Sequence, residues 1–93
     1  MTAAQIRDAL IEGIQEIQTL SGRPDQDIDD ETVPLDDLYE FDSLNAMEVT
    51  VRITDMCGIN AEQLGHLFTD SGRRLSVHEI VGRLCGVVET EGM

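Results

Sequence analysis

Lysine and tryptophan are absent from this 93-residue sequence, and aromatic residues make up only 3% of it. Its six cationic residues are all arginines, against 19 acidic residues, so the formal net charge at pH 7 is −13. A chain this acidic repels phosphate backbones and anionic lipid surfaces, which argues against nucleic-acid and membrane roles. The scarcity of aromatic side chains also argues against base stacking and an aromatic ligand pocket. The charge instead favours basic protein surfaces as partners.

Long apolar runs are missing as well. No stretch is long enough to span a membrane, and there are no repeats or low-complexity segments. The first residues lack the basic and apolar regions of a signal peptide, so we expect a cytoplasmic protein. The length and an ordinary apolar share predict one domain, residues 1–93, with one modest core.

Sequence patterns for catalysis and metal binding are also lacking. Cys57 and Cys85 have no CxxC or CxxH spacing and lie at apolar positions of expected helices, so we interpret them as reduced core thiols. P-loop, GxGxxG and zinc-binding spacings are absent, and His66 and His78 have no ligand partners nearby in the sequence. A Ser-His-Asp hydrolase needs a larger scaffold. We therefore expect no catalytic residues, no metal site and no enzymatic activity.

One acidic run is similar to the opening of a calcium-binding EF-hand loop, with Asp25, Asp27 and Asp29 at alternating positions. The rest of the loop pattern differs, because Asp36 occupies the place of the final bidentate glutamate and Pro34 interrupts the segment. A solvated acidic loop is the simpler interpretation, and a calcium site is kept as an alternative.

The expected elements are helices. Apolar residues at helical spacing and a capping box at Thr2 and Gln5 predict a helix over Ala3–Leu20, which Gly22 and Pro24 end. A long acidic stretch follows, and such a loop must be held down or carry function. Its candidate anchors are Ile28, Val33, Leu35, Leu38 and Phe41.

Three further helical segments are predicted after a short helical turn that begins at Pro34. The next helix runs from Ser43 to Cys57, with Gly58 suited to its end. A short helix follows from residue 60 or 61 to Leu67, and the segment from Thr69 to Gly72 ends it. The last helix opens with a capping box at Ser76 and Glu79. The predicted fold is all-α, a small four-helix bundle with a long loop between helices one and two and a short third helix.

The helix that begins at Ser43 has two apolar faces. At about 100° per residue, one face is the expected core stripe, flanked by Thr50 and Met56. Its members are Ala46, Val49, Ile53 and Cys57. The nearly opposite face carries three apolar residues interleaved with acids, namely Leu44, Met47, Val51, Glu48 and Asp55. The helix could be buried on most sides, but so short a chain surrounds few helices, so we interpret the second face as a docking surface.

Ser43 itself has two interpretations. Alone, Asp42-Ser43 before a helix indicates N-capping by either side chain. Together with Leu44, the residues that follow to Glu48, the apolar helix and the final helix at Ser76, this motif closely resembles the acyl carrier protein family over nearly the whole chain.

That resemblance implies a four-helix bundle with a 4′-phosphopantetheine arm, derived from coenzyme A, esterified to Ser43. Asp42 would match the family's neighbouring aspartate, which helps a magnesium-dependent phosphopantetheinyl transferase act on the serine. The arm's thiol would hold acyl intermediates as thioesters. The implied role is that of a noncatalytic, monomeric carrier for acyl-transferring and condensing enzymes with basic docking patches, which would contact Leu44, Met47, Glu48, Val51 and Asp55.

Three residues depart from the family pattern. Glu40 stands where many members have glycine, Asn45 replaces a common acidic residue, and Arg52 puts a positive charge on the recognition helix. These departures favour polyketide or other specialised acyl synthesis over general fatty acid synthesis. Two alternatives stay open: a peptidyl or aminoacyl carrier protein, and an acidic helical interaction module without a prosthetic group.

Overall fold

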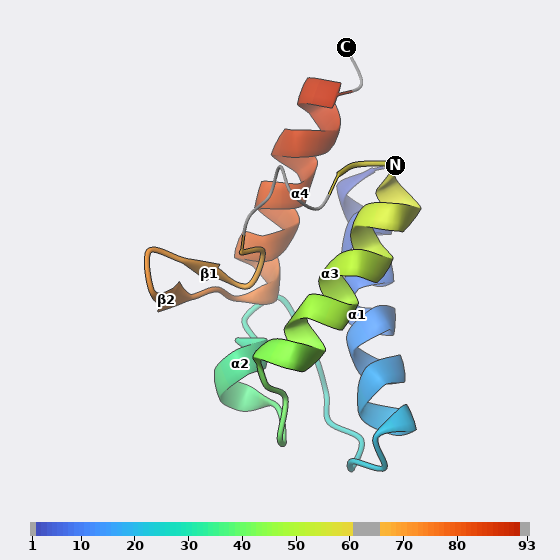
Figure 1. Cartoon of the computed structure of the whole chain (residues 1–93), viewed down its shortest axis with the longest axis vertical. Helices are drawn as coiled ribbons and strands as arrows, with labels where there is room; N and C mark the ends of the chain where they lie inside the picture. The colour runs from blue at the N-terminus through green and yellow to red at the C-terminus, as the bar shows by residue number, and fades with distance from the viewer. Residues whose placement is uncertain (1, 61–65, 92–93) are drawn as a thin grey trace.

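Three long helices surround one core in the computed structural model, which describes residues 2–60 and 66–91 (Figure 1). Within these ranges no helix is long and apolar enough to cross a membrane. In chain order the elements are α1 (Ala3–Leu20), α2 (Pro34–Asp37), α3 (Ser43–Cys57), β1 (Thr69–Asp70), β2 (Arg73–Arg74) and α4 (Val77–Glu91).

Local signals set the helix ends where the sequence predicts them. At the start of α1, the Thr2 side chain accepts a hydrogen bond from the backbone N–H of Gln5, and the Gln5 side chain accepts one from the N–H of Thr2. Pro34 occupies the first turn of α2. Gly58 ends α3 in the left-handed conformation, with φ of 70°, which a residue without Cβ adopts at little cost.

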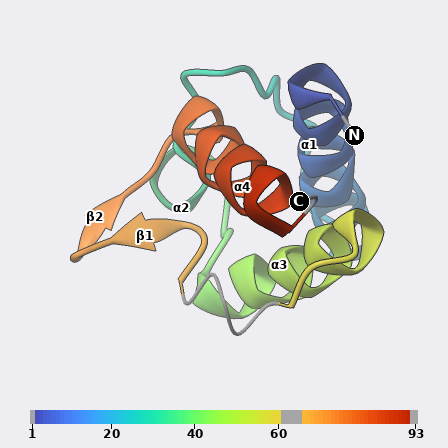
Figure 2. The ribbon, with the colours of Figure 1, turned by 90° about the horizontal axis from the view of Figure 1, so that it is seen from above.

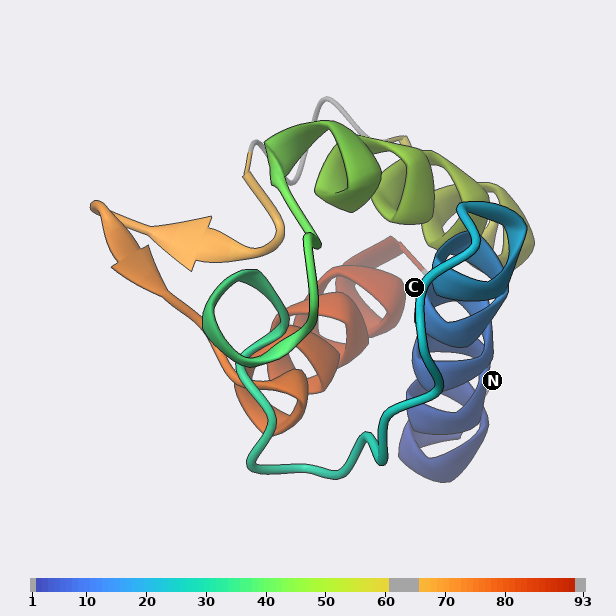
Figure 3. The ribbon, with the colours of Figure 1, turned by 90° about the horizontal axis from the view of Figure 1, so that it is seen from below.

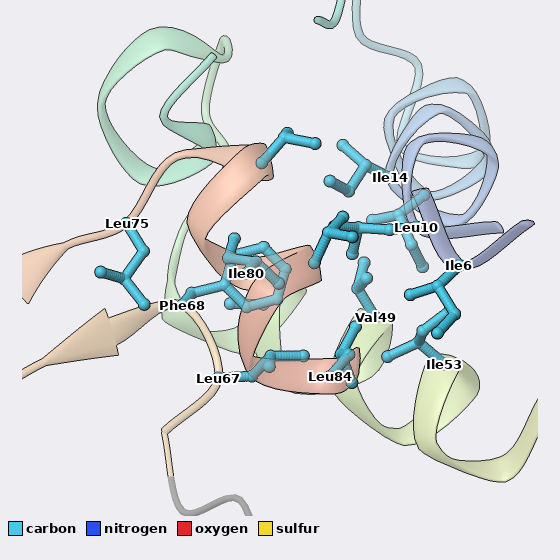
Figure 4. Packing of buried hydrophobic residues seen from close by; sticks show 14 of the residues in the cluster. Ile6, Leu10, Ile14, Val49, Ile53, Leu67, Phe68, Leu75, Ile80 and Leu84 are labelled. Carbon is cyan, nitrogen blue, oxygen red and sulfur yellow. The ribbon is translucent and has the colours of Figure 1, made fainter. Parts of the chain in front are cut away.

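The core lies between the long helices, and α1 packs against both α3 and α4 (Figures 2 and 4). The apolar stripe of α1 meets that of α3 on one side and that of α4 on the other, as the close view shows. The buried side chains from these three helices include Ile6, Leu10, Ile14, Ala46, Val49, Ile53, Ile80 and Leu84.

The long acidic loop is held near its middle and again at its C-terminal end. Near α4, the N–H groups of Val77 and His78 donate to the carbonyl oxygens of Thr32 and Asp30, at 2.8 and 2.9 Å. These bonds satisfy donors that the first turn of a helix leaves without helical partners. Figure 3 shows the loop running from the end of α1 along the side opposite α3 and past the start of α4 to α2. Of the predicted anchors, Leu38 and Phe41 are buried, whereas Ile28, Val33 and Leu35 are partly buried.

The segment between α3 and α4 differs from the prediction. Most of the expected third helix, residues 61–65, lies outside the described residues, and its flanking positions at 60, 66 and 67 are not helical. Thr69 to Gly72 does not end a helix but belongs to an antiparallel hairpin, in which Thr69 pairs with Arg74 and Asp70 with Arg73. The fold is therefore mostly helical with a small two-stranded sheet. Its fourth described helix is the turn at Pro34.

Candidate functional site

The segment that leads into α3 is fixed by two buried apolar residues. Leu38 is 6% exposed and Phe41 is 4% exposed. The ring of Phe41 lies against that of Phe68, with centroids 5.7 Å apart and planes tilted by 42°, a favourable aromatic arrangement. This pair ties the residues just before Ser43 to the segment just before β1. The chain therefore enters α3 from a packed position rather than from a free loop.

Asp42, not Ser43, caps α3. The Asp42 carboxylate oxygen Oδ1 accepts a hydrogen bond from the N–H of Asn45 at 3.0 Å, and the Asn45 side-chain oxygen accepts one from the N–H of Asp42 at 3.4 Å. The first helical bond runs from the N–H of Ala46 to the carbonyl oxygen of Asp42. Ser43 is thus the first residue of the helix. Its side chain is exposed, and among the described residues its hydroxyl has no hydrogen-bond partner.

Glu40 stands where many acyl carrier proteins have glycine, and its backbone conformation is one that favours glycine. Its φ is 54°, in the left-handed region that costs a residue with a Cβ about 1–2 kcal/mol. The neighbouring Tyr39 is held on both sides, because its carbonyl oxygen accepts from Gln18 at 2.8 Å and its N–H donates to Gln26 at 2.6 Å. Glycine would adopt this turn at no steric cost. Here the hydrogen bonds from Gln18 and to Gln26 hold the turn in place.

The two faces of α3 are separated as the periodicity predicts. Val49 and Ile53 are each 1% exposed, and Cys57 is half-buried beside the core. On the opposite face Leu44, Met47 and Val51 are 66%, 65% and 60% exposed. The acids among them, Glu48 and Asp55, are also exposed. Met56 does not flank the core as expected, because it is 60% exposed.

The positive charge on α3 is paired with α1. The Arg52 guanidinium lies 2.9 Å from the Glu16 carboxylate, so the cation is engaged across the α1–α3 groove. Both residues line an open groove of about 330 Å³ between the two helices, together with Gly13, Val49 and Ile53. Because Arg52 is paired with Glu16, its charge does not offset the acids Glu48 and Asp55. These two acids border the exposed strip of α3, which is formed by Leu44, Met47 and Val51.

Two residues near Ser43 were missed by sequence reasoning. Arg23, just after α1, donates hydrogen bonds to the side-chain oxygens of Gln18 and Asn45, at 2.8 and 2.7 Å. Gln18 is 6% exposed although it is polar, and it joins the same network. A polar residue at the end of an apolar stripe was the only signal that could have drawn attention to Gln18.

The acidic loop and the cysteines have structural explanations. Asp29 Oδ1 accepts from the N–H groups of Glu31 and Thr32, which makes a local turn. Across the described ranges no group of three or more His, Cys, Asp or Glu side chains is placed to hold a metal ion. The two cysteines are not joined in a disulfide, and burial raises the pKa of the Cys57 thiol. Both cysteines are partly buried and pack against the core, in line with the apolar helix positions that the sequence gives them.

Comparison with protein-family models gave a match over residues 14–64 to the family described as phosphopantetheine attachment site. The matched range covers more than half of the chain and includes Asp42, Ser43 and the whole of α3. The chain belongs to the phosphopantetheine attachment site family. Neither the comparison with curated proteins nor the comparison with solved structures gave a significant match.

Membership in the phosphopantetheine attachment site family confirms the predicted cofactor and the family resemblance. Domains of this family carry covalently attached 4′-phosphopantetheine and are generally noncatalytic. As carrier domains they interact with phosphopantetheinyl transferases and with synthase enzymes. The start of α3 fits such a group, since it presents an exposed hydroxyl beside backbone N–H groups that precede the first helical hydrogen bond.

Proposed function

We propose that the chain is a discrete acyl carrier protein in which Ser43 carries the 4′-phosphopantetheine arm. One observation carries the proposal: Asp42 caps α3 and leaves the Ser43 hydroxyl exposed on the first turn. During attachment, Ser43 Oγ would bond to the pantetheine-bearing phosphorus of coenzyme A. The pyrophosphate bond would break to release adenosine 3′,5′-bisphosphate, and the hydroxyl proton would pass to a base of the transferase.

The position at the start of α3 suits a phosphodiester. The positive end of the helix dipole and the N–H groups of the first turn favour an exposed anion there by about 0.3–1 kcal/mol. Asp42 would take part through its second carboxylate oxygen. Among the described residues only its Oδ1 accepts hydrogen bonds, so Oδ2 is available for the magnesium ion that the transferase uses.

The exposed strip of α3 would be the surface that partner enzymes recognise. Leu44, Met47 and Val51 give an apolar centre, and Glu48 and Asp55 give an acidic border. Apolar side chains at the centre of such a surface contribute most of the contact energy, whereas charges at its border accelerate encounter and select partners. Basic patches on acyl-transferring and condensing enzymes are the complementary surface.

The carrier would serve polyketide or another specialised acyl synthesis, with fatty acid synthesis and peptidyl or aminoacyl carriage as alternatives. The support is the set of departures at Glu40, Asn45 and Arg52. Glu40 and Asn45 belong to a network around residues 39–45, the attachment segment, which contains Ser43. These departures therefore change the approach to Ser43. The protein would act as a noncatalytic monomer in the cytoplasm.

The test is modification by a broad-specificity phosphopantetheinyl transferase with coenzyme A and magnesium, followed by intact-mass measurement. The wild-type chain should gain one phosphopantetheine, and Ser43→Ala should gain none. Ser21→Ala is the matched control, because Ser21 is also an exposed serine at a helix end, and it should be modified like the wild type. An unmodified wild-type chain, or a modified Ser43→Ala chain, would contradict the proposal.

An acidic interaction module without an arm is the second candidate, because the same exposed strip could bind a basic protein unaided. Met47→Ala and Val51→Ala should weaken partner binding under both hypotheses. Intact mass of the protein isolated from its native cell separates them. A phosphopantetheine adduct, with or without an acyl group, supports the carrier, whereas an unmodified chain together with binding unaffected by Ser43→Ala supports the module.

A further inference from the structure

Among the ion pairs found in the described part of the chain, Arg23 has the most buried arginine side chain. Its side chain is 14% exposed, whereas those of Arg7, Arg52, Arg73 and Arg74 are between 36% and 61% exposed. Taking a guanidinium group out of water costs free energy unless its N–H groups find acceptors. A partly buried arginine of this kind therefore indicates a specific structural task rather than a solvated surface charge.

The acceptors of Arg23 lie within the attachment segment and near the end of α1. Its Nη1 donates to Gln18 Oε1 at 2.8 Å and to Asn45 Oδ1 at 2.7 Å, and its Nε lies 3.9 Å from the Glu40 carboxylate. Gln18 is near the end of α1, and Asn45 is in the first turn of α3. Arg23 Nη1 thus links α1 to α3. The guanidinium also attracts Glu40, whose backbone is left-handed.

The contact with Asn45 reaches the cap of α3. Asn45 Oδ1 accepts from Arg23 and also from the N–H of Asp42, so the arginine fixes which way the Asn45 amide points. The same Asn45 donates its backbone N–H to the Asp42 carboxylate. Ser43 lies between two residues that this network holds. On the other side, Gln18 also donates to the carbonyl oxygen of Tyr39, which fixes the preceding turn.

We propose that Arg23 is a positioning residue for the modification of Ser43. It holds residues 39–42 and the first turn of α3 in one arrangement, so that the Ser43 hydroxyl and the Asp42 carboxylate reach the transferase already oriented. Preorganisation of this kind acts on the rate of group transfer, because a loose acceptor spends little time in the reactive geometry. The inference rests on the proposed attachment at Ser43. It adds that Arg23, which lies outside the Asp42-Ser43-Leu44 motif, controls the rate of that attachment.

The test compares Arg23→Gln with Arg7→Gln. Arg7 is an ion-paired arginine near the opposite end of α1 from the attachment segment (Figure 1), so the control removes the same charge elsewhere. Initial rates of phosphopantetheine transfer are measured against carrier concentration, at a temperature where circular dichroism shows each variant folded. Arg23→Gln should lower kcat/KM about tenfold, mainly through kcat, because it removes two charge-assisted hydrogen bonds. Arg7→Gln should stay near the wild type.

Amide hydrogen exchange supplies a second measurement. In Arg23→Gln, exchange at Asp42 and Asn45 should accelerate while the amides of Leu10 and Ile53, in the core, remain protected as in the wild type. A merely destabilising substitution would accelerate exchange throughout the chain and would leave transfer unchanged in the folded temperature range. That pattern would overturn the proposal.

Arg23→Lys is a second variant that keeps the test possible if Arg23→Gln does not fold. Lysine keeps the charge, but its side chain is one bond shorter and lacks the planar fork, so it cannot hold Gln18 and Asn45 together in the present geometry. It should lower kcat/KM about threefold. Transfer to both Arg23 variants at the wild-type rate overturns the role of Arg23 and leaves attachment at Ser43 intact. Failure of the wild-type chain to be modified overturns attachment itself.

Discussion

At the scale of single residues, Asp42 and Ser43 divide two tasks that either side chain could perform. A serine hydroxyl that caps a helix accepts a hydrogen bond from a backbone N–H of the first turn, so it points toward the helix. Here the carboxylate of Asp42 does this, so Ser43 can face solvent at the point where the helix presents unpaired N–H groups.

Substitution of Asp42 separates capping from chemistry. Asp42→Asn keeps an oxygen that can accept from the N–H of Asn45, so its free energy of unfolding should stay within about 0.5 kcal/mol of the wild type. Asp42→Ala loses the cap and should lower it by about 1 kcal/mol. Both variants lack the carboxylate and should be modified more slowly. Urea unfolding and transferase assays check this, and normal modification of Asp42→Asn would exclude a role for the charge.

At the scale of elements, α3 serves the core and the solvent with opposite faces of one helix. The buried face is continuous with the apolar stripe of α1, and the exposed face is bordered by acids. Because a helix repeats every 3.6 residues, residues two positions apart lie on different faces. Substitutions on the exposed face should therefore leave the core undisturbed.

Val49 and Val51 offer a matched pair for this division. Val49→Ala removes buried methyl groups and should lower the free energy of unfolding by about 2 kcal/mol. Val51→Ala removes the same atoms from a side chain that is 60% exposed, so its effect should be within about 0.5 kcal/mol. Binding of a carrier-recognising enzyme should show the reverse order. Equal destabilisation by the two substitutions would mean that both faces are packed.

The start of α4 should be sensitive to pH through Glu79. Its carboxylate accepts the N–H of Ser76 and pairs with Arg73, and these contacts lower the pKa of Glu79, the bond from Ser76 having the larger effect. A lowered pKa in the folded state stabilises the fold above the ordinary glutamate pKa, about 4.3, and this stabilisation is lost as pH falls through the folded value.

Glu79→Gln should therefore melt below the wild type at neutral pH and converge with it in acid. Glutamine still accepts the Ser76 N–H, so the difference reports mainly the charge. Glu12→Gln, at an exposed glutamate of α1, corrects for the loss of one negative charge. Thermal melts across pH measure both variants, and a difference that persists unchanged in acid would contradict this account.

At the scale of the whole molecule, a net charge of −13 is confined to a body with extents of 40 × 26 × 21 Å. At an ionic strength of about 0.01 M the screening length is about 30 Å, so the charges on one face act on most others. Six arginines cannot offset 19 acids, and the described ion pairs are mostly exposed and individually weak. Repulsion should dominate the long-range electrostatics.

Added salt should therefore stabilise the fold. Raising sodium chloride from about 0.01 M to 0.15 M shortens the screening length to about 8 Å and weakens repulsion between distant acids more than attraction within close pairs. The melting temperature should rise over this range. Potassium chloride at matched concentrations should give the same rise if screening is the cause. A melting temperature that is unchanged or lower in salt would show that charge crowding does not limit stability.

The sequence by itself determined the features that are settled within one or two turns of chain. Capping at Thr2 and Ser76, the start at Pro34 and the stop at Gly58 involve residues a few positions apart. As a result α1 and α3 begin and end, and α2 and α4 begin, where the pattern predicts. The exposure of the second face of α3 also followed from helical periodicity and chain length.

Tertiary structure decided the features that join distant residues. The sequence left Asp42 and Ser43 as equal candidates for the cap, and the choice follows from Asn45, which Arg23 orients from the end of α1. The hairpin at residues 69–74 has strands too short for a periodic signal, and its turn at Ser71 and Gly72 needs positive φ at both positions. Contacts across some twenty residues depend on how helices pack, and no local pattern encodes that packing.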